Sequence, residues 1–166
     1  MDLEYLVQKK VFSSDSVELQ RLVAHWRFKN LKIVFTNGCF DLVHLGHIDY
    51  LTRAAELGDV LAVGLNSDDS ARRIKGEGRP IMDQNSRSLL LASFLFVDAV
   101  IIFDQETPLE LIRLIQPDIL VKGADYKPEK IVGADIVTGN GGEVVTLPYL
   151  QGYSTSFIEK KIRQGS

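Results

Sequence analysis

The sequence predicts an α/β fold, in which a doubly wound parallel sheet of about five strands forms a single domain over residues 1–166. Three observations lead to this prediction. A chain of 166 residues is long enough to bury a core of its own. Short, continuous apolar runs alternate with helical segments, as in a parallel sheet that helices cover on both faces. No internal repeat, low-complexity tract or linker interrupts this alternation, and right-handed crossovers are therefore expected.

The first 30 residues are predicted to form an N-terminal helical segment, 1–30. Asp15 followed by Glu18 resembles a capping arrangement at the start of a helix. An apolar stripe at helical spacing follows, formed by Leu19, Leu22, Val23 and Trp26.

Beyond this segment, the apolar runs predict strands at residues 32–36, 60–66, 99–103, 118–123 and 143–148. The stretches between them predict helices at 46–57, 83–96, 107–115 and 128–138, and a last helix after Thr155. In such a sheet, ligands bind beyond the carboxyl ends of the strands, near the point where the strand order reverses. The first strand commonly borders that point, so the residues after it are the first candidates for a site.

The composition excludes several classes of protein. The net charge is −3, with 45% hydrophobic and 25% charged residues, and this offers no basic excess for nucleic acid. The most apolar stretch, "SLLLASFLFVDAVIIF", contains Asp98 and is shorter than the roughly 20 residues of a membrane helix. The N-terminus lacks the order of a secretion signal, and the single cysteine, Cys39, fits a reducing compartment. We therefore expect a cytoplasmic protein with no nucleic-acid or membrane partner.

Two histidines follow the first predicted strand, in "TNGCFDLVHLGHIDYLTRA". Asn37-Gly38 is a turn at which backbone can approach a ligand closely. Gly46 lies where the next helix should begin, and a helix N-terminus is a ready anion site. His44 and His47 could add hydrogen bonds to phosphate oxygens there. The alternatives are metal ligation, for which paired histidines usually stand at i, i+4 with a third ligand, and ordinary surface or core histidines.

The last predicted helix begins with a hydroxyl-rich sequence, "GYSTSFIEKKI". Ser154, Thr155 and Ser156 could cap this helix and point hydroxyl and N–H groups at phosphates. The alternative is a plain helix N-cap, since Ser and Thr are common there. Coupled to the two histidines, the phosphate interpretation is favoured.

A local basic segment, "ARRIKGEGRP" at 71–80, follows the second predicted strand. Its four basic residues, Arg72, Arg73, Lys75 and Arg79, outweigh Glu77 in a net-negative protein. Such a run is often a solvated face. Its two glycines and its position at the ligand edge of the sheet favour a mobile loop that closes over phosphate.

These motifs resemble the HxGH signature of the nucleotidyltransferase superfamily, which has a Rossmann-like fold. The likeness extends to the heptose-1-phosphate adenylyltransferase domain through "IVFTNGCFDLVHLGH", "GLNSDDSARRIKGEGRP", "FDQETPLELIRLIQPDILVKGADY" and "GGEVVTLPYLQGYSTS", which together cover about residues 30–163. Two positions depart from it: Ala124 replaces a glycine of the usual KGGDY, and Ser156 replaces a threonine. "PYLQG" lacks the arginine of glycerol-3-phosphate cytidylyltransferases.

The resemblance implies that ATP and D-glycero-D-manno-heptose 1-phosphate give ADP-heptose and pyrophosphate for lipopolysaccharide or surface-glycan synthesis. It implies catalytic roles for His44, His47 and Lys75. It implies nucleotide and phosphate contacts from Thr36, Asn37, Gly38, Cys39, Phe40, Gly46, Arg87, Lys122, Gly123, Gly152, Tyr153, Ser154, Thr155 and Ser156. It implies sugar-phosphate contacts from Asp41, Asn66, Asp68, Arg72, Arg79, Asp125 and Tyr126.

The expected partners are small molecules and a second copy of the chain. Mg²⁺ is expected to enter with ATP, held by phosphates and water, so no metal-binding residue is assigned. The resemblance implies a homodimer, and a separate heptose kinase that supplies the sugar 1-phosphate. Two alternatives remain open: another small nucleotidyltransferase, making CDP-glycerol or a flavin dinucleotide, and a nucleotide-binding regulator without turnover.

Overall fold

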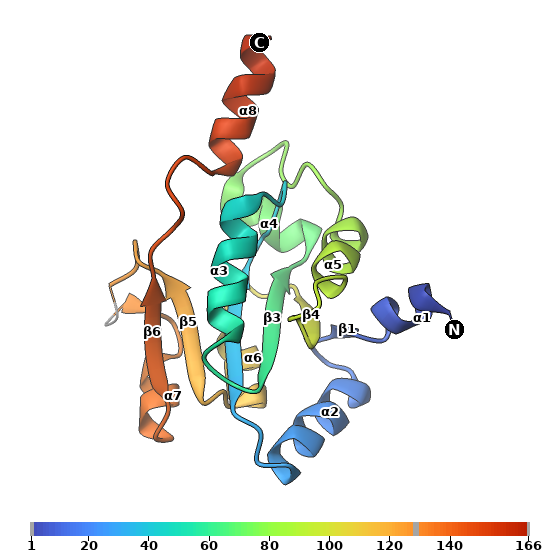
Figure 1. Cartoon of the computed structure of the whole chain (residues 1–166), viewed down its shortest axis with the longest axis vertical. Helices are drawn as coiled ribbons and strands as arrows, with labels where there is room; N and C mark the ends of the chain where they lie inside the picture. The colour runs from blue at the N-terminus through green and yellow to red at the C-terminus, as the bar shows by residue number, and fades with distance from the viewer. Residues whose placement is uncertain (1, 128–129, 166) are drawn as a thin grey trace.

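A computed structural model describes residues 2–127 and 130–165, and within them six parallel strands form one sheet (Figure 1). In chain order they are β1 (Val11–Ser13), β2 (Ile33–Gly38), β3 (Val60–Asn66), β4 (Ala99–Phe103), β5 (Ile119–Gly123) and β6 (Glu143–Leu147). The spatial order is β1-β4-β3-β2-β5-β6. The order reverses at β2, which pairs with β3 on one side and with β5 on the other. The predicted parallel sheet is confirmed, with one strand more than expected.

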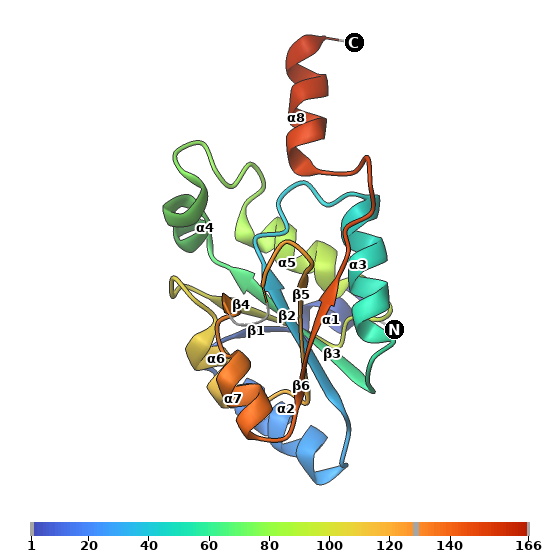
Figure 2. The ribbon, with the colours of Figure 1, turned by 90° about the vertical axis from the view of Figure 1, so that its left-hand side faces the viewer.

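Helices cover both faces of this sheet (Figure 2). They are α1 (Leu3–Gln8), α2 (Val17–Phe28), α3 (Leu45–Ala55), α4 (Asp68–Lys75), α5 (Gln84–Ala92), α6 (Leu109–Ile115), α7 (Ala134–Gly139) and α8 (Thr155–Gln164). Buried residues of α2, α6 and α7 pack on one face, and those of α3 and α5 pack on the other. The strands β3 and β5 are therefore almost wholly buried, which explains their uninterrupted apolar sequences.

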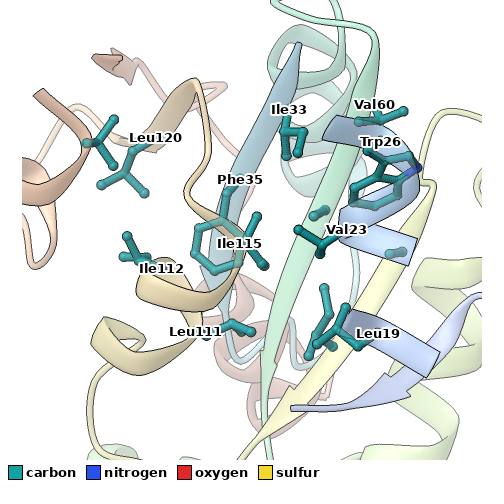
Figure 3. Packing of buried hydrophobic residues seen from close by; sticks show 14 of the residues in the cluster. Leu19, Val23, Trp26, Ile33, Phe35, Val60, Leu111, Ile112, Ile115 and Leu120 are labelled. Atoms are coloured by element: carbon teal, nitrogen blue, oxygen red, sulfur yellow. The ribbon is translucent and has the colours of Figure 1, made fainter. Parts of the chain in front are cut away.

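The apolar stripe of α2 joins one of the two cores (Figure 3). Leu19, Val23 and Trp26 lie against the sheet beside α6, whose Ile112 and Ile115 are fully buried. The helical spacing of this stripe is therefore explained by burial of one helix face.

The N-terminal segment 1–30 contains a strand as well as helices. β1 pairs with β4 and forms one edge of the sheet. Lys10, just before it, donates through Nζ to the carbonyl of Val97 at 2.8 Å. The start of α2 also differs from the prediction, because Ser16 rather than Asp15 is the N-cap and accepts from the Leu19 N–H at 3.3 Å.

The basic segment after β3 is partly helical rather than a loop. α4 spans Asp68–Lys75, with Ser67 as its N-cap, and the loop proper begins at Gly76, where φ is +93°. Three other helices are shorter than predicted, since α3, α5 and α6 end or begin inside the expected ranges. The helix predicted at 128–138 is reduced to α7; residues 128 and 129 lie outside the described residues.

The last helix, α8, projects away from the sheet (Figures 1 and 2). None of its residues is fully buried. Its contacts with the rest of the chain are made at its beginning, next to the ends of the strands. Across the described part of the chain, no helix combines the length and apolar character required to cross a membrane.

Candidate active site

A cleft of about 690 Å³ lies at the carboxyl ends of the strands. It opens around the end of β2, next to β5, where the strand order reverses, as the fold predicts. It brings together residues from distant parts of the chain. Predicted residues that line it are Asn37, Gly38, Cys39, Phe40, Asp41, His44, Gly46, His47, Asn66, Lys75, Arg79, Lys122, Gly123, Tyr126, Tyr153, Ser154, Thr155 and Ser156.

The loop between β2 and α3 carries the histidines in an unusual backbone conformation. Phe40 and Leu42 have φ values of 46° and 52°, in the left-handed region that side chains other than those of glycine rarely enter. Such conformations cost about 1–3 kcal/mol each and cluster at functional sites. Phe40 is nevertheless buried, and its ring makes an edge contact with His47 at 5.6 Å between centroids.

His44 and His47 stack on each other at the start of α3. Their ring centroids are 3.9 Å apart with 29° between planes. Gly46 permits this packing, since a Cβ there would lie 3.0 Å from the His44 ring and 3.2 Å from Cβ of Tyr153. His44 is the N-cap of α3. Both rings therefore line the cleft where the free N–H groups of a helix N-terminus also point.

The backbone fixes which nitrogen of His47 carries the proton. The His44 backbone N–H donates to Nδ1 of His47 at 3.3 Å, so the neutral ring has its hydrogen on Nε2. Burial, helped by neighbouring His44 and Lys75, lowers the pKa of His47 to about 4. Burial also lowers the pKa of His44, whose Nδ1 is buried without a partner among the described residues. At neutral pH this pair offers hydrogen bonds without net charge.

The N-terminus of α8 closes the cleft from the other side. Ser154 is its N-cap and accepts from the Phe157 N–H at 3.1 Å. The hydroxyl of Thr155 donates to the carbonyl of Asp41 at 3.0 Å, which ties α8 to the loop that carries the histidines. The N–H groups of Thr155 and Ser156 donate no hydrogen bond within the described residues. These N–H groups can therefore donate hydrogen bonds to an anion at the N-terminus of a ten-residue helix.

Lys122, at the end of β5, is a nearly buried cation. Its Nζ donates to Oδ1 of Asn37 and lies 5.8 Å from the centre of the Tyr126 ring. Burial lowers the pKa of Lys122 to about 8. Next to it, Gly123 leaves room for Tyr149, because a Cβ there would clash with the tyrosine hydroxyl. A cation in this position faces the cleft without a carboxylate partner within the described residues.

Arg79 and Asp41 line the cleft but satisfy each other. The Asp41 carboxylate accepts from Nη1 of Arg79 at 3.0 Å and from the N–H groups of Ile81 and Met82. Burial alone would raise the pKa of Asp41, but these hydrogen bonds prevail and lower it. Arg79 also pairs with Glu159 of α8 at 2.5 Å. These groups therefore brace the loop after α4 against α8, and the sugar-phosphate contact expected of Asp41 stays a prediction.

Asn66 also lines the cleft and has partners within the protein, and its expected sugar-phosphate contact stays a prediction. Its side-chain amide donates to Ser70 Oγ at 2.9 Å and accepts from the Cys39 thiol at 3.8 Å. Burial raises the pKa of that thiol. Lys75 differs, since it lines the cleft with no ion pair among the described residues.

Arg87 does not reach the cleft, contrary to the predicted phosphate contact. Its side chain is 0% exposed, and it donates to the carbonyls of Cys39 at 2.6 Å and Asn66 at 2.9 Å. It also donates to the carbonyl of Met82 at 2.9 Å and pairs with Asp68 at 2.7 Å. Asp68 is therefore a partner of Arg87 and lies outside the cleft lining. Together they fasten the ends of β2 and β3 to the segment before α5.

Four further predicted residues lie outside the cleft lining. Arg72 pairs with Asp69 on the exposed side of α4 at 2.6 Å. Thr36 is buried and shares a hydrogen bond of 2.8 Å with the hydroxyl of Tyr50. Gly152, at φ +82°, shapes the turn before α8. Asp125 lies next to Tyr149, where burial, with a further contribution from the Asp125 carboxylate, raises the pKa of the tyrosine to about 12.

The cleft also contains residues that the sequence did not single out. They are Tyr50, Ile74, Glu106, Thr107, Pro108, Lys130, Ile131, Val132 and Tyr149. Most lie in the segments that follow β4, β5 and β6, and no site role was assigned to them from the sequence. The signal that could have found them is their position just after predicted strands, since all strand ends of a parallel sheet share one edge.

The donor set favours a cation that arrives with its ligand over a resident metal. Within residues 2–127 and 130–165, no group of three or more His, Cys, Asp or Glu side chains could hold a metal ion. The two carboxylates in the lining, Asp41 and Glu106, are outnumbered by Lys75, Arg79, Lys122 and Lys130. A Mg²⁺ ion would thus find its oxygen ligands mainly on phosphates and water.

Comparison with known proteins gives a consistent result. The cytidylyltransferase-like family model matches residues 35–160. The chain is 52% identical over 96% of its length to a bifunctional protein HldE of Wolinella succinogenes, and 53% identical over 94% to one of Campylobacter jejuni. It spans 32% of each of these relatives, about a third of their length.

One solved structure extends the likeness to the fold. It is a lipopolysaccharide core biosynthesis protein from Thermoplasma volcanium, with 31% identity and a TM-score of 0.59. The match covers 75% of this chain and 99% of that one. The resemblance read from the HxGH sequence is thereby confirmed at the level of the family.

Proposed function

The chain belongs to the cytidylyltransferase-like family, and on that premise we propose that it transfers AMP from ATP to D-glycero-D-manno-heptose 1-phosphate. The products are ADP-heptose and pyrophosphate, for lipopolysaccharide or surface-glycan synthesis. The observation that carries this proposal is the meeting of two sequence motifs at one cleft. The histidine pair at the start of α3 and the hydroxyl-rich start of α8 line the same cavity.

The reaction requires no covalent intermediate with the protein. A phosphate oxygen of the sugar phosphate attacks the α-phosphorus of ATP, and the bond to the β-phosphate oxygen breaks as pyrophosphate leaves. Catalysis then rests on positioning and on stabilising charge on phosphate oxygens. Nε2–H of His47 and the ring of His44 donate to those oxygens, Lys75 supplies positive charge, and the α8 N-terminus binds the departing phosphates.

Lys122 and the tyrosines next to it belong to the nucleotide side of this site. Lys122 lies on the same side of the sheet reversal as the strand that leads into α8, because β5 and β6 are neighbours. Because Lys122 has no carboxylate partner within the described residues, its ammonium group would pair with a phosphate of the bound nucleotide. We propose that Mg²⁺ enters with ATP and neutralises phosphate charge, since the lining provides few free carboxylates.

The choice of heptose follows from the likeness of motifs such as "TPLELI" and "KGADY" throughout the chain. It is supported by about 50% identity to bifunctional HldE proteins. Because the chain spans only about a third of those relatives, their remaining activity is not transferred to it. A cytoplasmic location, a homodimer and a separate kinase stay predictions.

Pyrophosphate release, measured for a matrix of nucleotides against sugar phosphates, tests the proposal. The matrix contains ATP and CTP, both anomers of the heptose 1-phosphate, glycerol 3-phosphate and flavin mononucleotide, with Mg²⁺ throughout. We expect release with ATP and one heptose 1-phosphate anomer only. Release with CTP and glycerol 3-phosphate, or with ATP and flavin mononucleotide, would replace the substrate. Nucleotide binding without any release would identify a regulator.

A further inference from the structure

One carboxylate in the cleft has no role in the reaction described so far. Glu106 lines the cavity and takes part in no hydrogen bond or ion pair within the described residues. The other lining carboxylate, Asp41, is consumed by Arg79 and two backbone N–H groups. Glu106 is therefore the uncommitted acidic group of a cleft whose other charged side chains are mostly basic.

The backbone holds Glu106 in place from both sides. Gln105, just before it, accepts through its carbonyl from Ser70 Oγ of α4 at 3.1 Å. Asp104 pairs with Arg73 of the same helix at 3.2 Å. Two residues later, Pro108 is the N-cap of α6, and its carbonyl accepts from the Ile112 N–H at 2.9 Å. The backbone on both sides of Glu106 is therefore anchored, which fixes where its side chain leaves the chain at the cleft.

Glu106 lies on the opposite side of the histidine pair from the start of α8. It follows β4, and β4 is separated from β2 by β3, whereas β5 and β6 lie on the other side of β2. Ser154 to Ser156 follow β6, so the cleft is lined from both sides of β2, the strand that leads to His44 and His47. We call the two sides of this lining the β4 arm and the α8 arm. If the α8 arm takes the triphosphate, the β4 arm remains for the acceptor. Ile74 and Thr107 line this second arm with Glu106.

The chemistry of a carboxylate selects among the groups of the substrates. It repels phosphate oxygens and accepts hydrogen bonds from hydroxyl groups. A sugar 1-phosphate presents several hydroxyl donors at the end remote from its phosphate. A carboxylate that accepts a hydrogen bond from such a hydroxyl group discriminates strongly against a substrate that lacks the hydroxyl. In a complex with that substrate, the carboxylate of the site would be left unpaired.

We propose that Glu106 is a specificity-determining residue that accepts hydrogen bonds from the hydroxyl groups of the sugar phosphate acceptor. The inference rests on the proposed function and adds the residue that reads the sugar. It places acceptor recognition on the loop between β4 and α6, and nucleotide recognition on the side of β5, β6 and α8.

Steady-state kinetics of three variants test this inference. Glu106→Ala removes the hydrogen-bond-accepting carboxylate, and Glu106→Gln replaces it with an uncharged amide that still has an accepting oxygen. Glu110→Gln is the matched control. Glu110 lies on the exposed side of α6 and pairs with Arg113. For Glu106→Ala we expect the KM of heptose 1-phosphate to rise about tenfold while the KM of ATP stays within about twofold. Glu106→Gln should fall between the wild type and Glu106→Ala, and Glu110→Gln should match the wild type.

The possible failures are distinguishable. If neither heptose 1-phosphate anomer supports pyrophosphate release by the wild type, the proposed function is contradicted. The same variants are then compared on the hydroxyl-bearing phosphate that the wild type does accept. A rise in the KM of ATP alone would place Glu106 on the nucleotide and overturn the inference. Unchanged KM values for both substrates, or a wild type that accepts no hydroxyl-bearing phosphate, would overturn it as well.

Discussion

His47 illustrates how local backbone contacts set the chemistry of a single residue. Its Nδ1 accepts from the backbone of His44, and burial keeps the ring neutral near pH 7. The remaining nitrogen is a hydrogen-bond donor that does not titrate in the physiological range. A fixed neutral donor stabilises developing charge on a phosphate oxygen without first having to take up a proton.

Replacing His47 by Ala should therefore slow the reaction and leave the protein folded. Loss of one preorganised donor typically lowers kcat by roughly 10²–10³, and we expect a loss of at least that size. The measurement is pyrophosphate release at saturating substrates, with circular dichroism as the check on folding. His25→Ala is the control, since His25 is exposed on α2 and outside the cleft. Near-normal turnover by His47→Ala would contradict the role assigned to this ring.

The lowered pKa of His47 also predicts how stability depends on pH. The unfolded chain binds a proton near pH 6.5, whereas the folded ring binds one only near pH 4. Between these values the unfolded state binds more protons, so the free energy of unfolding falls as the pH falls. His47→Gln should remove this contribution. Between pH 7 and pH 5, the free energy of unfolding of the variant should therefore fall by about 1–2 kcal/mol less than that of the wild type. Urea denaturation at both pH values measures it, and equal losses in the two proteins would refute it.

Sequence motifs located some site residues well and others poorly. The histidines and Ser154–Ser156 are found because each group stands in a short motif at an element boundary. The role of Arg87 could not be predicted, because only the fold shows that its guanidinium is buried among carbonyl groups. Glu106 and Tyr149 lie in stretches that carry the family likeness, but their residue types and spacing indicate no chemistry of their own. The topology of the sheet brings them to the cleft, and this topology cannot be read from individual residues.

At the scale of elements, Arg87 acts as a clamp. From α5 it binds the carbonyl groups that end β2 and β3, and it pairs with Asp68 at the start of α4. The loop with the histidines is thus held from behind by a side chain that does not line the cleft. Its removal would leave several buried carbonyl groups unsatisfied.

We expect Arg87→Met to lower the free energy of unfolding by about 2–4 kcal/mol. Arg72→Met is the matched control, because Arg72 forms an exposed ion pair on α4 and should cost less than about 0.5 kcal/mol. Urea denaturation of both variants gives the comparison. If Arg87→Met unfolded like the wild type and only weakened ATP binding, the phosphate contact predicted from the sequence would be restored.

Elements were predictable where burial imposes a pattern. Strands β3 and β4 were placed at their observed bounds because continuous apolar runs fit strands covered on both faces. β1 has three residues and lies at the sheet edge, too short for a pattern to emerge. α4 was missed because its sequence is highly polar, with two buried residues, Ser70 and Ala71. Its helical state depends on contacts with the loop after β4.

At the scale of the whole molecule, the sheet gathers charge that the composition hides. The chain is net negative, yet its cleft is lined by four basic side chains and two acidic ones. One of these acids is neutralised by Arg79. The parallel topology produces this concentration, since the carboxyl ends of β2 to β6 open on one edge. The net charge of the whole chain gave no reason to expect nucleic-acid binding. It could not reveal a local site for an anion.

The transfer of the α-phosphate tests the central claim most directly. The protein is incubated with Mg²⁺, heptose 1-phosphate and ATP labelled at the α-phosphorus, and the products are separated by chromatography. The account predicts that the label enters an ADP-heptose, in an amount equal to the pyrophosphate formed, and that His47→Ala makes little of it. Label that stays in ATP, or that appears only in AMP or ADP, would contradict adenylyl transfer to the sugar phosphate.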